Sequence, residues 1–343
     1  MVVIMKTGVS EEGVQRVVAK LIDMNFNVHR STGVQRTILG AIGDQTDFDP
    51  RTIEALDDVR EVVRITKPYK LASRNFKRED TVVEVGGGKI GGEEIVIIAG
   101  VGVIEAENQI NTAAEAVSKT GARILLGNVY AKSFSPHDFQ GLGEKGWRYL
   151  YEAGKKFGLG VMSEIRSVRK VAAAAEYVDI FLVGAQNIQN FELLGEIGKL
   201  KKPVVLKRGF SATLEETLIS AEHIMSQGNY NVILCESGVR TFGLYKRNTL
   251  DIAAVSAFQQ LSHLPVIVDP SQCANDSAEF AALCKAAVVA GSHGLIIKAG
   301  GNAKNVESNA AYSVELDQFE KLTFECSALS QTASDVRQAI FSN

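Results

Sequence analysis

Eight short apolar runs, each followed by a segment with helical periodicity, occupy the chain from Ile95 onward. The runs are IVIIAG, ARILLG, LGVMSE, DIFLVG, PVVLKR, NVILCE, PVIVDP and GLIIKA. Continuous apolar character is typical of strands that are buried on both faces of a parallel sheet. Eight such units over about 250 residues match the size of a (β/α)8 TIM barrel. We therefore predict an α/β fold in which residues 95–343 form this barrel.

Residues 1–70 carry a different pattern, β-α-β-β-α-β, which is that of a ferredoxin-like module. After a helix-capping Ser10, apolar residues recur at helical spacing at Val14, Val17 and Leu21. We predict an N-terminal ferredoxin-like α+β domain of a regulatory type.

Between these two parts, residues 71–94 include the glycines of a GxGxxG sequence, Gly86, Gly88 and Gly91. A dinucleotide site requires a helix to begin at such glycines, whereas here another strand follows. We predict a linker and a β-hairpin in this segment, and no cofactor.

The composition of the chain limits the classes of binding partner that we expect. The chain has 37 basic and 40 acidic residues, and no basic run is interleaved with aromatic residues. We therefore expect a small-molecule anionic substrate, no nucleic acid and no membrane partner. The four cysteines lack CxxC spacing and the N-terminus lacks the apolar run of a signal peptide, which predicts a cytoplasmic protein. We expect a homo-oligomer, either a dimer or a tetramer.

Charged residues close five of the eight runs. They are Glu164, Lys207 with Arg208, Glu236, Asp269 and Lys298. The carboxyl ends of barrel strands meet at one opening, which we call the mouth, and active sites of TIM barrels lie there. Because isolated buried charge is costly, these groups either form structural ion pairs or hold a charged ligand.

Longer motifs carry a resemblance to a known family. They are FQGLGEKG, NIQNFELL after VGAQ, KPVVLKRGF, VILCESGVRTF, RNTLDIAAV and SHLPVIVDPS. These motifs resemble the 3-deoxy-7-phosphoheptulonate (DAHP) synthases, of the subgroup that includes the 3-deoxy-octulosonate 8-phosphate synthases. The resemblance implies a condensation of phosphoenolpyruvate with an aldose phosphate, which is erythrose 4-phosphate for DAHP synthases, usually with a divalent metal.

The resemblance fails at the four positions where it implies metal ligands. Gly102, Gln272, Lys298 and Asn309 stand where the family has cysteine, histidine, glutamate and aspartate. Amide oxygens and an ammonium are unsuited to a divalent cation, so we expect no metal at this position and no cofactor.

The residues that the family uses to grip phosphate also change. Gln186 and Ser237 replace arginines, Ala131 and Ser133 replace a lysine and an arginine, and Lys132 lies one place along. A further family arginine is Leu126. Each lost charge-assisted contact is worth roughly 1.5–3 kcal/mol, so we expect phosphoenolpyruvate affinity to be lost.

From the strand ends and the resemblance together we predict two groups of site residues. The candidate catalytic residues are Lys298, Lys207, Glu236 and Asp269. The candidate substrate-binding residues are Gln186, Arg208, Ser237, Gln272, Asn309, Tyr130, Lys132 and Glu164.

Two interpretations of Lys298 stay open. In one, its ammonium fills the vacated metal position and neutralises Asp269 and Glu236. In the other, Lys298 is desolvated beside Lys207 and attacks a carbonyl to form a Schiff base.

Three functions follow. The main expectation is a diverged, metal-independent DAHP synthase-like enzyme with carbon–carbon bond chemistry on a small carboxylate or 2-oxo acid of shikimate-related or specialised metabolism. The second is a non-catalytic regulatory or binding protein. The third is an active DAHP synthase with a relocated metal.

Overall fold

A computed structural model describes residues 1–32, 37–43, 49–63, 68–131, 135, 137–242, 248–299 and 313–341. The chain divides into two compact units. The first comprises Met1–Asp80 with Gln260–His263, and the second Thr81–Gln259 with Leu264–Asn343. The finer division into 1–70, 71–94 and 95–343 stays a prediction.

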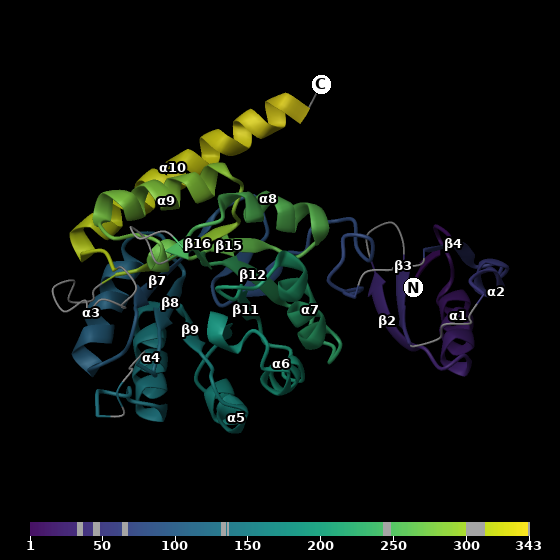
Figure 1. Cartoon of the computed structure of the whole chain (residues 1–343), viewed down its shortest axis with the longest axis horizontal. Coiled ribbons are helices and arrows are strands. Elements are labelled where there is room, and N and C mark those ends of the chain that lie inside the picture. Colours follow the sequence, from purple (N-terminus) through teal and green to yellow (C-terminus); the bar gives the residue numbers. More distant parts are fainter. Residues whose placement is uncertain are drawn as a thin grey trace. The chain divides into compact units, whose positions relative to one another are not determined.

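The first unit is a four-stranded sheet with two helices (Figure 1). Its elements are β1 (Val2–Met5), α1 (Glu11–Asp23), β2 (Asn27–Thr32), β3 (Thr37–Ile42), α2 (Arg51–Glu54) and β4 (Val59–Val63). The antiparallel order β2-β3-β1-β4 is that of the predicted ferredoxin-like module, which is confirmed. The Ser10 side chain accepts a hydrogen bond from the Gly13 backbone and so caps α1. Val14, Val17 and Leu21 are buried, as their spacing predicts.

The second unit contains a closed barrel of eight parallel strands. In the order around the barrel they are β10 (Ile180–Val183), β11 (Val204–Lys207), β12 (Val232–Glu236), β15 (Val266–Val268), β16 (Gly294–Lys298), β7 (Val96–Val101), β8 (Ile124–Gly127) and β9 (Gly160–Glu164). Each predicted apolar run overlaps one of these strands. The (β/α)8 TIM barrel is therefore confirmed.

Helices surround the strands (Figure 1). They are α3 (Glu107–Ser118), α4 (Glu144–Phe157), α5 (Val171–Ala175), α6 (Phe191–Gly198), α7 (Leu214–Met225), α8 (Ile252–Leu261), α9 (Ser277–Val289) and α10 (Leu316–Phe341). Short 3-10 turns follow three of the strands: η1 (Val168–Lys170), η2 (Ala185–Asn187) and η3 (Pro270–Gln272). A small hairpin of β13 (Val239–Arg240) and β14 (Asn248–Thr249) follows β12.

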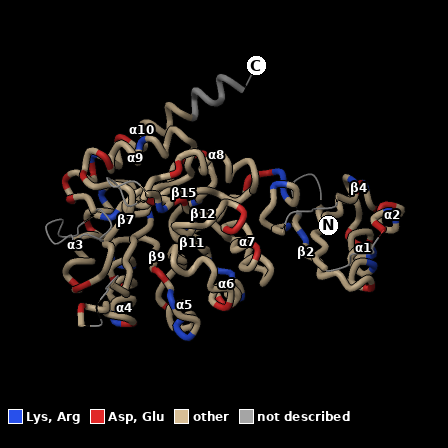
Figure 2. The backbone as a smooth tube through the Cα atoms, in the orientation of Figure 1, with Lys and Arg blue, Asp and Glu red and all other residues tan. Residues whose placement is uncertain are grey.

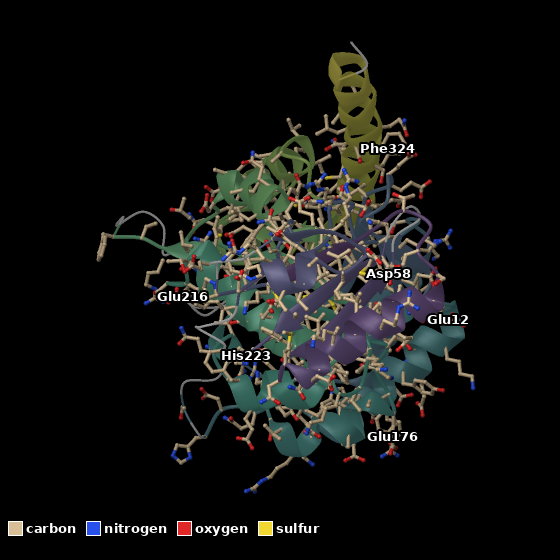
Figure 3. The ribbon with its side chains drawn as sticks, turned by 90° about the vertical axis from the view of Figure 1, so that its right-hand side faces the viewer. Glu12, Asp58, Glu176, Glu216, His223 and Phe324 are labelled. Carbon is tan, nitrogen blue, oxygen red and sulfur yellow. The ribbon has the colours of Figure 1, made fainter. Side chains whose placement is uncertain are left out.

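Charged side chains and some large apolar ones lie on the outer surface of these helices. Basic and acidic residues are interspersed along them in Figure 2. Glu216 on α7 projects outward in Figure 3, as does Phe324 of α10, which is 75% exposed. Within the described residues, no helix is both long and apolar enough to cross a membrane.

The amino-terminal end of the barrel is closed by the antiparallel hairpin of β5 (Val83–Val85) and β6 (Gly88–Ile90). Val83, Val85 and Ile90 belong to the same buried cluster as the interior residues of the barrel strands. The prediction of a hairpin in place of a dinucleotide fingerprint therefore agrees with the structure. With this end filled by apolar side chains, the polar groups lie at the other end.

Candidate active site

The interior of the barrel is built in layers that lead up to the mouth. Met162 of β9, Val205 of β11 and Ile267 of β15 belong to the buried apolar cluster inside the barrel. Side chains alternate between the two faces of a strand, so the next residues of the same parity are Glu164, Lys207 and Asp269. The sequence places charged side chains where the apolar layers end.

Lys207, Asp269 and Lys298 form one buried cluster at the mouth. The Lys207 ammonium donates to Oδ2 of Asp269, and the Lys298 Nζ lies 4.0 Å from the same oxygen. Lys298 also donates a hydrogen bond of 2.8 Å to Ser271 Oγ, and that hydroxyl in turn donates to Asp269 Oδ1. The structure therefore brings three of the four predicted catalytic residues together.

The charges in this cluster support one another. Burial alone would raise the pKa of Asp269, but Lys207, Lys298 and Ser271 together hold that pKa well below its ordinary value. Burial alone would lower the pKa of Lys207, yet the Asp269 carboxylate outweighs it and the pKa is raised. Asp269 is therefore an anion and Lys207 a cation at neutral pH.

Glu236 and Arg208 form a separate network. Arg208 Nη1 donates to Glu236 Oε2 at 3.0 Å and to Asp251 Oδ2 at 2.9 Å. The Gly238 backbone donates to Glu236 Oε1 at 2.7 Å. Glu236 is adjacent in β12 to the interior residue Cys235, so its side chain points to the opposite face of the strand. The idea that Lys298 neutralises Glu236 is therefore wrong, because Arg208 already does so.

Glu164 and Tyr130 meet at Arg166, a residue that the sequence reasoning missed. Arg166 Nη2 donates to Glu164 Oε2 at 3.0 Å, and the guanidinium lies 5.6 Å from the centre of the Tyr130 ring. The Glu164 backbone donates to Asn128 Oδ1 at 3.0 Å, and Asn128 Nδ2 donates to the Gly102 carbonyl. These contacts tie together the ends of β7, β8 and β9.

The remaining predicted site residues have different positions. Ser237 is buried, and its Oγ has no hydrogen-bond partner. The Nε2 atom of Gln272 is also buried without a hydrogen-bond partner. Gln186, in η2, is exposed. Cys273, next to Gln272, contacts the Ser237 carbonyl at 3.7 Å, which places the two loops side by side. Lys132 and Asn309 lie outside the described residues.

The groups around Lys298 do not fit a divalent cation. A Cβ atom on Gly102 would lie 3.6 Å from Lys298 Cδ, so the lysine stem runs over this glycine. Residue 102 offers no side-chain donor, and an ammonium repels a cation. In the part of the chain that the structure describes, no three His, Cys, Asp or Glu residues are grouped for metal binding.

Gly100 lets β7 approach β8 beside this cluster. It pairs with Lys298 in the barrel and has a φ of +152°. A Cβ atom there would lie 2.1 Å from the Leu126 carbonyl oxygen. Only glycine allows this spacing.

A barrel of this topology with charged strand ends is typical of a TIM-barrel enzyme, and comparison with known families specifies the class. The DAHP synthetase I family matches residues 75–335, and the DAHP synthase ferredoxin-like domain matches residues 1–67. The chain belongs to the DAHP synthetase I family.

Known relatives are similar over most or nearly all of the chain. The phospho-2-dehydro-3-deoxyheptonate aldolase of Thermotoga maritima is 42% identical over 329 residues, which cover 96% of this chain and 97% of that protein. The crystal structure of a Thermotoga maritima DAHP synthase matches with a TM-score of 0.76 at 41% identity, over 97% of this chain and 98% of the other. The 2-dehydro-3-deoxyphosphooctonate aldolase of Syntrophobacter fumaroxidans is 27% identical and covers 70% of this chain and 88% of its own length.

These comparisons contradict the expectation of a diverged enzyme with a changed reaction. Identity of 42% across both chains supports an active DAHP synthase. The Schiff base belonged to that expectation and is not proposed. Lys298 donates to Ser271 Oγ and its Nζ lies 4.0 Å from Asp269 Oδ2, contacts that fit an ion pair with this carboxylate. The substitutions at the family's phosphate and metal positions therefore do not exclude the family's reaction, and Arg166 is a further cation beside the strand ends.

Proposed function

We propose that the chain catalyses the phospho-2-dehydro-3-deoxyheptonate aldolase reaction, the condensation of phosphoenolpyruvate with erythrose 4-phosphate. The observation that carries this proposal is the cluster in which Lys207 and Lys298 flank Asp269 at the carboxyl ends of the strands. In the reaction the methylene carbon of phosphoenolpyruvate bonds to the aldehyde carbon. Water adds to the enol carbon and inorganic phosphate leaves, without oxidation or reduction.

The two ammonium groups can bind the substrate carboxylate and stabilise the alkoxide that forms in this reaction. Both substrates are anions, and a carboxylate gains charge-assisted hydrogen bonds from ammonium donors. Attack on the aldehyde turns its oxygen into an alkoxide, which a fixed cation stabilises in a site of low dielectric constant. We assign the carboxylate to Lys207 and the developing alkoxide to Lys298.

Asp269 and Ser271 position these cations. Asp269 is ionised at neutral pH and therefore has no proton to donate. We assign it the role of fixing the positions of Lys207 and Lys298 through its carboxylate. Ser271 bridges Asp269 and Lys298 through its hydroxyl. Ser237 and Gln272, each with a buried polar atom lacking a partner, are proposed as substrate contacts.

The water that adds to the enol carbon leaves its hydroxyl group there, and its remaining proton goes to the alkoxide, so the condensation needs no other co-reactant. The donors near Lys298 do not fit a divalent ion, so no step is assigned to a metal there. We also propose that the protein is cytoplasmic and forms a homo-oligomer, either a dimer or a tetramer. Light scattering of the purified chain tests the oligomeric state, and a monomer at every concentration would refute it.

The reaction itself is tested by measuring phosphate release from the purified full-length chain. The assay contains phosphoenolpyruvate and erythrose 4-phosphate, each alone and together, with and without added Mn²⁺. We expect release that requires both substrates and is lost in Lys207→Met. Release at the level of the no-enzyme control under every condition would refute the proposed function.

A further inference from the structure

Arg166 lies at the mouth, on the side formed by β8, β9 and β10. Arg166 follows Glu164, the last residue of β9, by two positions. Its guanidinium contacts the carbonyls of Tyr130 and Ala131, which follow β8, and the Glu164 carboxylate, so it lies beside the carboxyl ends of β8 and β9. The 5.6 Å separation between guanidinium and Tyr130 ring agrees with this placement.

The protein fixes the guanidinium firmly. Arg166 Nη1 donates to the Ala131 carbonyl at 3.1 Å, and Nη2 donates to Glu164 at 3.0 Å and approaches the Tyr130 carbonyl at 3.4 Å. Trp147 supports Tyr130 through an edge-to-face contact with ring centres 5.9 Å apart, and its indole donates to Ser163 at 3.1 Å. A cation held by four neighbouring groups has little rotamer entropy left to lose when a ligand binds.

These contacts do not use all of the donors of Arg166. A guanidinium has five N–H groups, and the Nε–H of Arg166 is buried without a hydrogen-bond partner. The side chain keeps 24% of its surface exposed. Arg166 is therefore anchored, and a ligand that accepts hydrogen bonds would reach the exposed part of its guanidinium and not the buried Nε–H.

Glu164 connects Arg166 with the lysine cluster. Arg166 donates a hydrogen bond to its carboxylate, and the charge of that carboxylate contributes to raising the pKa of Lys207. A Cβ atom on Gly184 would lie 2.2 Å from Glu164 Oε1, which puts the start of η2 on the other side of this carboxylate. Leu126 of β8 and Gln186 of η2, the turn that follows β10, are neutral.

We propose that Arg166 binds a phosphate monoester of the substrate at the mouth, while Lys207 and Lys298 take the carboxylate and the reacting oxygen. Planar guanidinium groups match phosphate oxygens in geometry, and phosphate contacts are among their strongest hydrogen bonds. This inference deepens the proposed function and rests on it for the identity of the ester, which is phosphoenolpyruvate or erythrose 4-phosphate.

The test compares wild type with Arg166→Met and Arg166→Lys, with Arg169→Met as the control. Arg169 is an exposed arginine in the neighbouring turn η1. Two measurements are made on the full chain: KM for each substrate in turn, and calorimetric binding of phosphoenolpyruvate and of pyruvate, which lacks the phosphate. Thermal unfolding of every variant reports structural damage.

For Arg166→Met we expect KM for one substrate to rise at least about tenfold, the factor that corresponds to about 1.4 kcal/mol. The substrate whose KM rises identifies the ester. If that ester is phosphoenolpyruvate, its binding weakens by a similar factor while pyruvate binding stays as in wild type. Arg166→Lys recovers part of the loss, and Arg169→Met changes nothing.

Two results would overturn the assignment. One is wild-type KM values for both substrates in Arg166→Met. The other is a loss that affects phosphoenolpyruvate and pyruvate equally together with a lower unfolding temperature, as expected if Arg166 only holds the Tyr130 loop. If wild type releases no phosphate, the proposed function fails, and the calorimetric titrations are extended to erythrose 4-phosphate. Weaker binding of either ester in Arg166→Met then supports the assignment, and unchanged binding of both refutes it.

Discussion

Lys207 and Lys298 approach the same carboxylate oxygen, Oδ2 of Asp269. The two lysines come from β11 and β16, on either side of the strand that leads to Asp269. A single buried anion thus fixes two cations at the mouth of the barrel. The binding roles proposed for Lys207 and Lys298 and the positioning role proposed for Asp269 depend on that arrangement.

Removing the Lys298 ammonium should slow the reaction without unfolding the chain. Lys298→Met keeps the unbranched stem that runs over Gly102 but removes a charged donor worth about 1.5–3 kcal/mol. We expect kcat/KM to fall roughly 10- to 150-fold, by the same free-energy range. Steady-state kinetics measure this, with the exposed Lys119→Met as the control. Unchanged kinetics in Lys298→Met would remove Lys298 from the site.

The position of Lys298 should hold no divalent metal. Because an ammonium lies where the resemblance places a metal ligand, we expect exhaustive chelation to leave the unfolding temperature unchanged. Anomalous diffraction from crystals soaked in Mn²⁺ should show no peak at coordination distance from Asp269 or Gln272. A stoichiometric peak there would contradict the electrostatic account of the cluster.

Arg208 should act mainly on stability. Arg208→Met leaves the buried carboxylate of Glu236 without its cation, and breaking a buried pair costs about 3–5 kcal/mol. In the wild-type protein, burial raises the pKa of Glu236 above its ordinary value, although Arg208 acts to lower it. Without Arg208 the folded variant should hold a proton on Glu236 to higher pH than the unfolded chain does. Its stability deficit relative to wild type should therefore shrink as the pH falls.

Urea unfolding of wild type and Arg208→Met at pH 7.5 and pH 5 measures that deficit. The exposed Arg169→Met serves as the control for loss of an arginine. An equal deficit at both pH values would show that Glu236 is not the group left unpaired.

His263 should make the folded state less stable in mild acid. Burial lowers the pKa of His263 from 6.5 to about 4, although its hydrogen bond of 2.8 Å to the Leu71 carbonyl opposes the shift. Between these values the unfolded chain binds a proton that the folded chain does not, so stability falls as the pH drops from 6.5 toward 4. The loss is at most about 3 kcal/mol, from about 1.4 kcal/mol per pH unit.

This dependence is measured by urea unfolding between pH 7 and pH 4.5 for wild type and His263→Gln. The variant should show a shallower fall in the free energy of unfolding. His223→Gln, on the exposed side of α7, retains His263 and should keep the wild-type slope. Equal slopes in wild type and His263→Gln would contradict the assignment.

The fold could be predicted from the sequence because hydrophobic pattern alone specifies it. Eight apolar runs became eight barrel strands, and the β-α-β-β-α-β pattern became the four-stranded sheet of the first unit. The hairpin was predictable for a similar reason, since the glycine-rich segment leads into a strand rather than a helix.

The site was only partly predictable. Strand-end position was enough to bring Lys207, Asp269 and Lys298 together, because the barrel gathers these ends. It could not show that Glu236 and Arg208 belong to a separate network, since that depends on the face from which each side chain leaves its strand. Arg166 lies two residues beyond the end of β9, where strand alternation no longer applies, so the strand pattern could not identify it.

The central claim is that this barrel joins the two substrates, and the identity of the product tests it most directly. Phosphoenolpyruvate labelled with ¹³C at its methylene carbon is incubated with erythrose 4-phosphate and the full-length chain, and the mixture is followed by ¹³C NMR. We predict that the label appears in a seven-carbon product, bonded to the former aldehyde carbon of the sugar, and that Lys207→Met forms none. Label found only in unreacted phosphoenolpyruvate or in pyruvate would contradict the account.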